Sequence, residues 1–421
     1  MPRQVLFLLT SQFPYGKGEA FLESEVPYLA EAFDEVIIVT NDMTTADKRP
    51  TADNVSVVRL PYSASRLRLK TIIATLWSGH VWEELLRLLF TYRLAPSVAR
   101  LRTIFGSWRN AKRIARNLRQ LLRQRTSSDD AVIAYSYWCD DNALALAMMP
   151  SYMRNIKRVS RVHRWDVYLY AHSSRYLPFR SFIAKRLDYI ISISNDGADY
   201  IRTKWKVGKP ANLHVSRLGI GNSSEPVTPT PPPYVVFSCS NLIPVKRVNL
   251  IIEALCLIRD ITIRWIHIGD GPQGPSLQRL AMQRLGGNIQ WRFMGALTNS
   301  EVFELYRQHQ PCLFLNLSAS EGVPVSIMEA ISFGVPVIAT DVGGNREIVN
   351  EQTGNLLEAH PESEQVAEAI TQLMRLPPEQ CHRLRRTTRE FWELNYNAEV
   401  NYPGFVRHLK SLMELSAEPR T

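Results

Sequence analysis

Short apolar runs alternate with longer stretches of helical periodicity along most of the chain. In the first half, the runs that predict buried strands span residues 4–9, 35–40, 56–60, 131–135, 158–162 and 189–194. In the second half, they span residues 234–240, 261–268, 311–316 and 335–340. Apolar strands separated by helices are typical of parallel sheets that helices cover on both faces. The pattern therefore predicts the α/β class.

One segment interrupts this alternation near the middle of the chain. Residues 221–233 are rich in Pro, Ser and Thr, which pack poorly and favour an extended linker. A chain of 421 residues also exceeds the usual size of a single core, so two or three domains are expected. We therefore predict one domain over residues 1–222, a second over residues 234–390, and terminal helices over residues 391–421.

Two carboxylates, Glu321 and Glu329, lie eight positions apart with no other charge between them. Pro324 is expected to begin a helix and Gly334 to end it, so Glu321 lies in the loop after a strand and Glu329 in the second helical turn. The free amides at such a helix start favour an anion, and carboxylates accept hydrogen bonds from sugar hydroxyls. The pair indicates a sugar-nucleotide site, although Glu residues eight apart also occur on solvated helices.

The loop after the next predicted strand continues this pattern with Gly343, Gly344 and Glu347. In this region the chain resembles the retaining glycosyltransferases of family 4, which carry an E-x7-E motif followed by a G-G-x-x-E loop. The resemblance implies the GT-B fold, with two Rossmann-like domains facing each other across a cleft and C-terminal helices that pack back on the first domain. It implies retaining transfer of a sugar, of the hexosyltransferase class, from a nucleoside-diphosphate sugar to an acceptor hydroxyl.

A loop with two adjacent basic residues follows the predicted strand at residues 234–240. The resemblance implies that Lys246 contacts the donor diphosphate. The family often has an Arg where this chain has Asn241, so either Arg247 or Asn241 would take the place of that second phosphate contact. A Lys-Arg pair in a loop is also commonly just solvated.

Residues 269–274 match the dinucleotide fingerprint G-x-G-x-x-G letter for letter. That fingerprint requires a carboxylate roughly 20 residues on to hold the ribose, and the chain has no Asp or Glu between Gly271 and Ser300. We therefore reject a dinucleotide site. The resemblance implies instead that Gly269 and Gly271 form the family's G-x-G loop, where glycine allows a tight strand-to-helix turn.

The resemblance also assigns roles to the donor-side residues. Glu321 positions the donor sugar, and Glu329 binds the ribose. Lys246 and the amides of Val325 and Ser326 would stabilise charge on the leaving diphosphate, which a metal does in other glycosyltransferases. The sequence offers no D-x-D motif that we interpret as a metal site, so neither a metal nor another cofactor is expected.

Three loops in the first half are candidates for the acceptor side. The loop with Gly16 and Gly18 follows the first predicted strand and, by resemblance, faces the donor phosphate and the acceptor. His163 and Asp166 resemble the family's H-x-x-D loop, whose His contacts the donor sugar or the transferred group. Trp138 would line the acceptor side, because aromatic faces suit sugar rings. A plain turn, a structural His and core packing are the respective alternatives.

The remaining composition argues against several classes of protein. The five cysteines are scattered, with no C-x-x-C pair and no His at metal-ligand spacing, which favours a reduced cytoplasmic protein without structural zinc. The apolar run at residues 5–9 is too short for a signal sequence. The uncharged run at residues 226–245 is broken by prolines. We therefore expect a protein that is not integral to a membrane.

Residues 61–125 lie outside the resemblance and hold much of the positive charge. The segment has fourteen Lys and Arg against two Glu, and the whole chain has a formal net charge of +10. Apolar residues such as Ile104, Trp108, Ala111 and Leu118 recur at helical spacing. We predict basic amphipathic helices that dock on an anionic membrane, which would place the protein on the inner face of the cell membrane. Core-facing helices with solvated outer faces are the alternative.

We therefore expect a glycosyltransferase whose acceptor is a saccharide or lipid-linked saccharide in bacterial surface polysaccharide synthesis, such as exopolysaccharide, capsule or lipopolysaccharide. A sugar-nucleotide epimerase of the same fold is the alternative enzyme. The basic composition also suggests a nucleic-acid-binding protein. No nucleic-acid motif accompanies the charge, so nucleic acid is not an expected partner.

Overall fold

The computed structural model describes residues 2–16, 18–19, 21–41, 45, 47–60, 75, 77–150, 153, 155–207, 212–222, 224–229 and 231–414. The chain divides into two compact units. Unit 1 comprises Met1–Leu218 and Tyr402–Thr421, and unit 2 comprises Gly219–Asn401. Each unit is an α/β domain, and the chain returns to unit 1 for most of its last helix.

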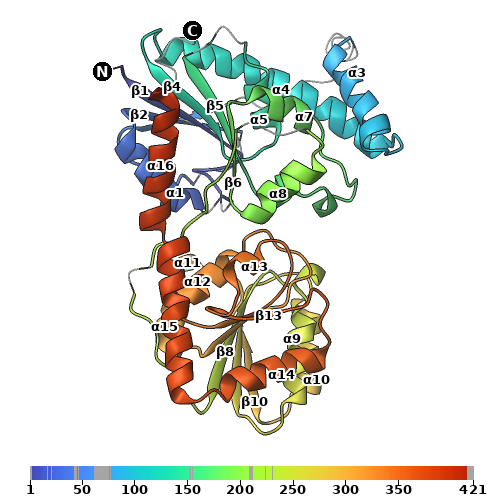
Figure 1. Ribbon diagram of the computed structural model, residues 1–421, viewed down its shortest axis with the longest axis vertical. Helices are drawn as coiled ribbons and strands as arrows, with labels where there is room; N and C mark the ends of the chain where they lie inside the picture. The colour runs from blue at the N-terminus through green and yellow to red at the C-terminus, as the bar shows by residue number, and fades with distance from the viewer. Residues whose placement is uncertain are drawn as a thin grey trace. The chain divides into compact units, whose positions relative to one another are not determined.

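Unit 1 is built on a parallel sheet with the strand order β3-β2-β1-β4-β5-β6-β7 (Figure 1). Its strands are β1 (Gln4–Thr10), β2 (Glu35–Thr40), β3 (Val55–Arg59), β4 (Ala131–Ser136), β5 (Ile156–Val162), β6 (Tyr189–Ser192) and β7 (Leu213–Val215). β1 pairs in parallel with β2 on one side and with β4 on the other. The strand order therefore changes direction between β1 and β4.

Helices cover both faces of this sheet (Figure 1). They are α1 (Phe21–Ala32), α3 (Gly79–Leu86), the π-helical turn η1 (Arg87–Thr91), α4 (Val98–Arg125), α5 (Asp141–Ala147), α6 (Arg164–Val167), the 3-10 turn η2 (Leu169–Ala171), α7 (Arg180–Arg186), α8 (Asn195–Lys204) and α16 (Ala398–Glu414). One face packs on α3, α4, α5, α7 and α8, and the other on α1 and α16. Successive residues of β1 alternate between these two layers, as the pleat requires.

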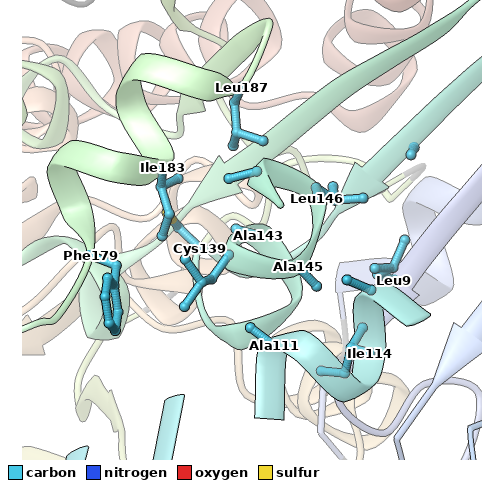
Figure 2. Close-up of a cluster of buried hydrophobic side chains, with 14 of the residues drawn as sticks. Leu9, Ala111, Ile114, Cys139, Ala143, Ala145, Leu146, Phe179, Ile183 and Leu187 are labelled. Carbon is cyan, nitrogen blue, oxygen red and sulfur yellow. The ribbon is translucent and has the colours of Figure 1, made fainter. Parts of the chain in front are cut away.

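The apolar stripe of α4 is part of the unit 1 core. The hydroxyl of Ser97 caps the helix by accepting a hydrogen bond from the amide of Arg100 at 3.3 Å. The buried side chains of α4 are Ile104, Trp108, Ala111, Ile114, Ala115, Leu118 and Leu122. Figure 2 shows Ala111 and Ile114 in one cluster with Cys139 and Ala145. The outer face of the helix carries its exposed basic side chains.

The apolar stripe of α4 therefore faces the core, as the core-facing alternative expected, and membrane docking of the basic segment stays a prediction. The physical reason is that a sheet of continuous apolar strands needs a cover, and α4 supplies part of it. Residues 61–74 and 76 of the predicted basic segment lie outside the described residues.

Unit 2 is built on a second parallel sheet, with the strand order β10-β9-β8-β11-β12-β13 (Figure 1). Its strands are β8 (Tyr234–Cys239), β9 (Ile263–Ile268), β10 (Ile289–Phe293), β11 (Leu313–Asn316), β12 (Val337–Thr340) and β13 (Gly354–Leu357). Its helices are the 3-10 turn η3 (Pro244–Lys246), α9 (Val248–Leu257), α10 (Gly274–Arg284), α11 (Asn299–His309), α12 (Val325–Ser332), α13 (Asn345–Ile348), α14 (Ser363–Met374) and α15 (Pro378–Asn395). The order of the strands in this sheet changes direction between β8 and β11.

Two apolar layers sandwich this second sheet. On one face, Val236 and Trp265 pack with residues of α9, α10 and α14. On the other face, the rings of Phe237 and Tyr306 lie 5.0 Å apart, and Tyr306 stacks on Phe333 at 4.8 Å. The sequence prediction of an α/β chain with parallel sheets is confirmed.

The predicted linker at residues 221–233 belongs to unit 2 instead of separating the units. The side-chain amide of Asn222 donates to the Ser332 hydroxyl at 2.8 Å, and the main-chain amide of Val227 donates to the Phe333 carbonyl at 3.1 Å. Hydrogen bonds of this kind order a Pro-rich segment, and composition does not reveal them. The boundary therefore falls after Leu218, before the Pro-rich stretch.

The predicted terminal segment at residues 391–421 is shared between the two units. α15 packs against α12 within unit 2 and buries Trp392 there. Residues from Tyr402 onward belong to unit 1, where Phe405 and Leu409 of α16 are buried against the sheet.

Candidate functional site

The carboxyl ends of β8 and β11 form the centre of the candidate site in unit 2. The strand order changes direction between these neighbours, and ligands of open α/β sheets bind at such a switch point. The loop after β8 carries Asn241, Lys246 and Arg247, and the loop after β11 carries Glu321. Residues 75 positions apart in the sequence therefore meet at one edge.

Lys246 and Glu321 form an ion pair at this edge. The Lys246 Nζ lies 2.5 Å from the Glu321 Oε1. The same oxygen accepts hydrogen bonds from the Ser318 hydroxyl at 2.6 Å and from the Asn316 side-chain amide at 3.4 Å. The Glu321 carboxylate is buried, whereas 20% of the Lys246 side chain is exposed. A buried carboxylate thus holds a partly exposed ammonium group in place.

Arg247 is engaged by main-chain carbonyls. Its Nε donates to the carbonyl of Leu317 at 2.6 Å, and its Nη2 donates to those of Ser318 at 2.8 Å and Ala359 at 3.0 Å. Burial lowers the pKa of the guanidinium. This geometry supports a brace between two loops and does not support the predicted second phosphate contact.

Gly269 and Gly271 bring the loop after β9 against the loop after β8. Their φ angles are +135° and +159°, and a Cβ at Gly269 would lie 2.0 Å from the Ser240 carbonyl oxygen. A Cβ at Gly271 would lie 2.6 Å from the Leu242 carbonyl oxygen. The turn expected from the G-x-G sequence is present, and close approach between the two loops is a further reason for these glycines. Asn241 is exposed beside this contact.

α12 begins at Val325 after Pro324 and ends just before Gly334, as the sequence predicts. The first amides of a helix, here those of Val325 and Ser326, have no acceptor within the helix. With the helix dipole, they favour an anion. The amino end of α12 lies four residues beyond Glu321 in the sequence, so the helix start and the ion pair are linked by one short loop.

Glu329 is buried in the second turn of α12. Its Oε1 accepts a hydrogen bond from the Asn299 side-chain amide at 2.6 Å. Burial raises the pKa of Glu329 to about 7, although the hydrogen bond from Asn299 opposes that rise. The sequence did not single out Asn299, because an uncharged residue at the start of a helix carries no signal of its partner.

Gly343 and Gly344 pack against the main chain that carries Glu321. Gly343 has a φ of +53°, and a Cβ there would lie 2.1 Å from the Glu321 carbonyl oxygen. A Cβ at Gly344 would lie 2.5 Å from the Gly322 carbonyl oxygen, to which the Gly344 amide donates at 2.8 Å. The two glycines therefore fix the backbone beside Glu321.

In unit 1, Glu19 organises the loop after β1. Its carboxylate accepts hydrogen bonds from the amides of Ser11 at 2.9 Å, Gln12 at 2.8 Å and Phe13 at 2.7 Å. The Trp138 indole, from the loop after β4, donates to the same carboxylate at 2.8 Å. Sequence reasoning missed this residue as a site component, because its partners are main-chain amides.

The predicted glycine positions lie in this same loop. Gly16 has a φ of +65°, and a Cβ at Gly18 would lie 2.7 Å from the side-chain oxygen of Gln12. The loop is therefore compact, and the positive φ of Gly16 is a conformation that favours glycine.

The imidazole of His163 is buried against aromatic rings. Its centroid lies 4.5 Å from those of Tyr137 and Trp138. Neither ring nitrogen has a hydrogen-bond partner among the described residues. Burial and the nearby charge of Arg161 hold the pKa of His163 well below its usual range. The ring is neutral and retains its capacity to hydrogen-bond a ligand.

Asp166 supports the main chain instead of facing a ligand. Its Oδ1 accepts from the His163 amide and its Oδ2 from the Cys139 amide, both at 2.6 Å. Burial raises the pKa of Asp166 to about 6. It therefore orients the loops that carry His163 and Trp138.

The described part of the chain shows no cluster of three His, Cys, Asp or Glu side chains arranged to hold a metal ion. Within the same residues, no helix combines the length and the apolar character needed to cross a membrane.

The structure is similar to solved proteins over nearly its whole length. The lipopolysaccharide outer core galactosyltransferase WaaB is 15% identical over 97% of this chain and 99% of that protein, with a TM-score of 0.64. Anabaena HepE, solved in complex with UDP, is 16% identical over 97% of this chain and 100% of that protein, also with a TM-score of 0.64. The chain has the GT-B fold.

Within this GT-B chain, the family model described as glycosyl transferases group 1 matches residues 222–391. The match spans most of unit 2, including Lys246, Glu321 and Glu329. WcaL of Escherichia coli strain K12, provisionally named a colanic acid biosynthesis glycosyltransferase, is 24% identical over 57% of this chain. EpsD of Bacillus subtilis strain 168, provisionally named a glycosyltransferase, is 26% identical over 52% of this chain. The similarity spans 60% of the length of each of these two relatives.

Proposed function

We propose that this protein is a retaining glycosyltransferase that moves a sugar from a nucleoside-diphosphate sugar to an acceptor hydroxyl. The observation that carries the proposal is the Lys246–Glu321 ion pair at the switch point of unit 2, close in sequence to the first turn of α12 and inside the segment that matches the group 1 model. A fixed ammonium group and free helix amides suit a diphosphate better than a neutral ligand.

In the proposed reaction, the bond between the anomeric carbon and the diphosphate oxygen breaks, and negative charge builds on the diphosphate. Lys246 and the amides of Val325 and Ser326 stabilise that charge, so no metal is needed for the leaving group. The acceptor oxygen forms the new bond to the anomeric carbon and loses its proton. Glu321 accepts hydrogen bonds from the donor sugar, and Glu329 accepts them from the ribose.

On the acceptor side, we propose that the neutral ring of His163 contacts the donor sugar and that Trp138 offers an aromatic face to a sugar ring. The UDP bound to HepE supports a nucleoside diphosphate as the donor. We propose an acceptor in surface polysaccharide synthesis, either a saccharide or a lipid-linked saccharide. The name of WcaL, which refers to colanic acid biosynthesis, supports a biosynthetic role.

A donor screen tests this function. The protein is incubated with a panel of nucleotide sugars and a lipid-linked saccharide, and release of nucleoside diphosphate is followed in excess chelator. We expect release with at least one donor and its loss in Lys246→Met. Conversion of a donor to its epimer without diphosphate release would indicate the epimerase instead. Loss of activity in chelator with rescue by Mg²⁺ would contradict the proposed role of Lys246 and the helix amides.

We also propose that unit 1 docks on an anionic membrane surface, through α3 and η1 instead of the stripe of α4. The side chains of Trp77, Leu86 and Phe90 are 85%, 54% and 74% exposed, while Val81 and Leu88 of the same segment are buried in the core. A helical segment that is apolar on both sides is not typical of a solvated surface. Aromatic side chains at a surface suit the headgroup region of a membrane.

Charge on the neighbouring helix complements an anionic leaflet. α4 contacts α3 and exposes basic side chains at Arg102, Arg109, Lys112, Arg116 and Arg123. Basic residues near such a leaflet contribute on the order of 1 kcal/mol each. Insertion of the exposed apolar side chains and attraction of the basic side chains to the anionic leaflet are together sufficient for reversible binding without a spanning helix.

Vesicle sedimentation tests the docking surface. The protein should pellet with anionic vesicles but not with neutral ones, and high salt should release it. Phe90→Ser and the pair Arg116→Glu and Arg123→Glu should each weaken binding. Met282→Ser is the matched control, because Met282 is 74% exposed on α10 of unit 2. Unchanged binding in both test variants would show that α3, η1 and α4 do not form the docking surface.

A further inference from the structure

A cavity lies within unit 2, at the opposite end of the sheet from Lys246 and Glu321. Its volume is about 580 Å³, within the usual range of ligand pockets, roughly 300–1,000 Å³. Tyr234 and Leu313, which begin β8 and β11, form part of its wall. The site described above lies at the carboxyl ends of these same two strands, so the two sites are separated by the length of the strands.

The lining of this cavity is largely apolar. Leu373 comes from α14, Leu384 from α15, and Val227 from the Pro-rich segment that precedes β8. Leu373 and Leu384 are half-buried, so the cavity presents apolar carbon surface to an incoming molecule. An apolar wall of this kind suits a hydrocarbon chain better than a sugar or a nucleotide.

One buried cation also lines the cavity. Arg385 is only 7% exposed, and its guanidinium donates to the carbonyl of Val227 at 2.7 Å and, with longer contacts of 3.4 and 3.5 Å, to those of Pro311 and Cys312. All three acceptors are neutral. Among the described residues, no carboxylate lies within ion-pair distance of Arg385, although Arg389 on the same helix pairs with Glu393 at 2.7 Å. A buried charge without a counter-charge is costly, and an anionic ligand would remove that cost.

We propose that this cavity is a binding site for an amphipathic carboxylate of the medium-chain acyl class, whose carboxylate pairs with Arg385 while its chain lies along Leu313, Leu373 and Leu384. The apolar wall favours a ligand with a hydrocarbon chain, and the buried guanidinium favours a ligand with a negative charge. Two further arginines at the cavity, Arg386 and Arg389, are paired with Glu390 and Glu393, so among the described lining residues the unpaired positive charge is that of Arg385. The site does not depend on the proposed glycosyl transfer, because no residue of the Lys246–Glu321 group contributes to it.

Calorimetric titration with octanoate, without donor or acceptor, tests this site separately from the enzyme activity. Octanol is the neutral control ligand. We expect octanoate to bind with one site per chain and octanol to bind roughly tenfold or more weakly, since the octanol hydroxyl can still accept a hydrogen bond from Arg385 but has no negative charge to pair with it. Equal binding of the two ligands would overturn the role of Arg385, and no binding of octanoate would overturn the site itself.

Two variants locate the bound ligand. Leu384→Trp fills the cavity from α15 and should abolish octanoate binding, whereas Leu394→Trp, at a position 78% exposed on the same helix, should leave it unchanged. Arg385→Met should reduce octanoate affinity to that of octanol, with circular dichroism as the check that the variant is folded. If Arg385→Met does not fold, Leu384→Trp still decides, because octanoate binding that survives in Leu384→Trp would place the ligand elsewhere.

Discussion

The carboxyl edges of the two sheets use their charged groups in different ways. In unit 2, Glu321 is paired with Lys246, whose ammonium group remains partly exposed. In unit 1, Glu19 and Asp166 accept hydrogen bonds from main-chain amides, and His163 is neutral. A carboxylate that is bound to amides orders its loop, whereas an exposed ammonium can still bind an anion. The edge of unit 2 therefore presents a charged group to a ligand, whereas the edge of unit 1 presents ordered loops and a neutral imidazole ring.

Removal of the ammonium group should have the largest effect. Lys246→Met should lower kcat/KM with a nucleotide sugar by roughly 10²–10³-fold, because it removes a preorganised charge from the leaving diphosphate. Arg247→Met is the matched control, since Arg247 braces carbonyls, and its folded fraction should retain kcat/KM within about tenfold of the wild type. Equal losses in both variants would contradict the distinction between these adjacent basic residues.

Removal of the buried carboxylate should have the next largest effect. Glu321→Ala should reduce turnover by about 10²-fold, because the donor sugar loses a positioning contact. The loss should appear mainly in kcat, since Lys246 is still present to bind the diphosphate. Steady-state kinetics would measure the separate changes in kcat and KM, on protein that circular dichroism shows to be folded. Near-normal turnover would remove Glu321 from the site.

The corresponding change in unit 1 should act on stability. Asp166→Asn weakens the acceptors for the amides of His163 and Cys139 and should lower the free energy of unfolding by roughly 1–3 kcal/mol. Chemical denaturation measures this change, and Glu31→Gln on the exposed side of α1 is the control. A variant as stable as the wild type would show that Asp166 does not hold these loops.

The pKa of Glu329 gives a prediction with a definite sign. Burial raises the folded-state pKa to about 7, so the folded protein binds a proton that the unfolded chain releases at lower pH. This contribution to the free energy of unfolding is present in acid and is lost as the pH rises through about 7. The free energy of unfolding should fall by on the order of 1–3 kcal/mol over that range. Denaturant unfolding at several pH values should show the loss in the wild type but not in Glu329→Gln. Parallel profiles in the two proteins would contradict the raised pKa.

The smallest expected effect concerns His163. Because its pKa is well below the usual range, the ring stays neutral, and the profile of kcat/KM between about pH 6 and 9 should show no ionisation of His163. His163→Gln, which keeps a neutral polar side chain, should lower the rate without changing the shape of that profile. A lost inflection in the variant would show that His163 titrates.

The strands were largely predictable because most of them are buried on both faces and therefore form continuous apolar runs. The three that the pattern missed, β7, β10 and β13, all lie at sheet edges. Only the first residue of β10 is buried, the others being half-buried or exposed, and those of β13 are all half-buried. An edge strand needs less apolar sequence, so its signal is weaker.

Charge and spacing singled out Glu321 and Glu329 as candidate site residues. Their supporting residues were not predictable from the sequence. Asn299 and Ser318 are uncharged, and their partners become apparent only when distant segments meet. The carbonyls that Arg247 braces lie 70 and more positions away in the sequence. Local sequence contains no information about such acceptors.

The return of the chain to unit 1 has a consequence for biosynthesis. Unit 2 is one continuous stretch, so it can fold as soon as residues 219–401 have left the ribosome. Unit 1 cannot complete its core at that stage, because the sheet face that includes Leu6 and Leu8 is covered by α1 and by Phe405, Leu409 and Leu412 of α16. The half that is synthesised first therefore finishes folding last, and the part of its apolar sheet face that α16 covers stays exposed during translation of the other half.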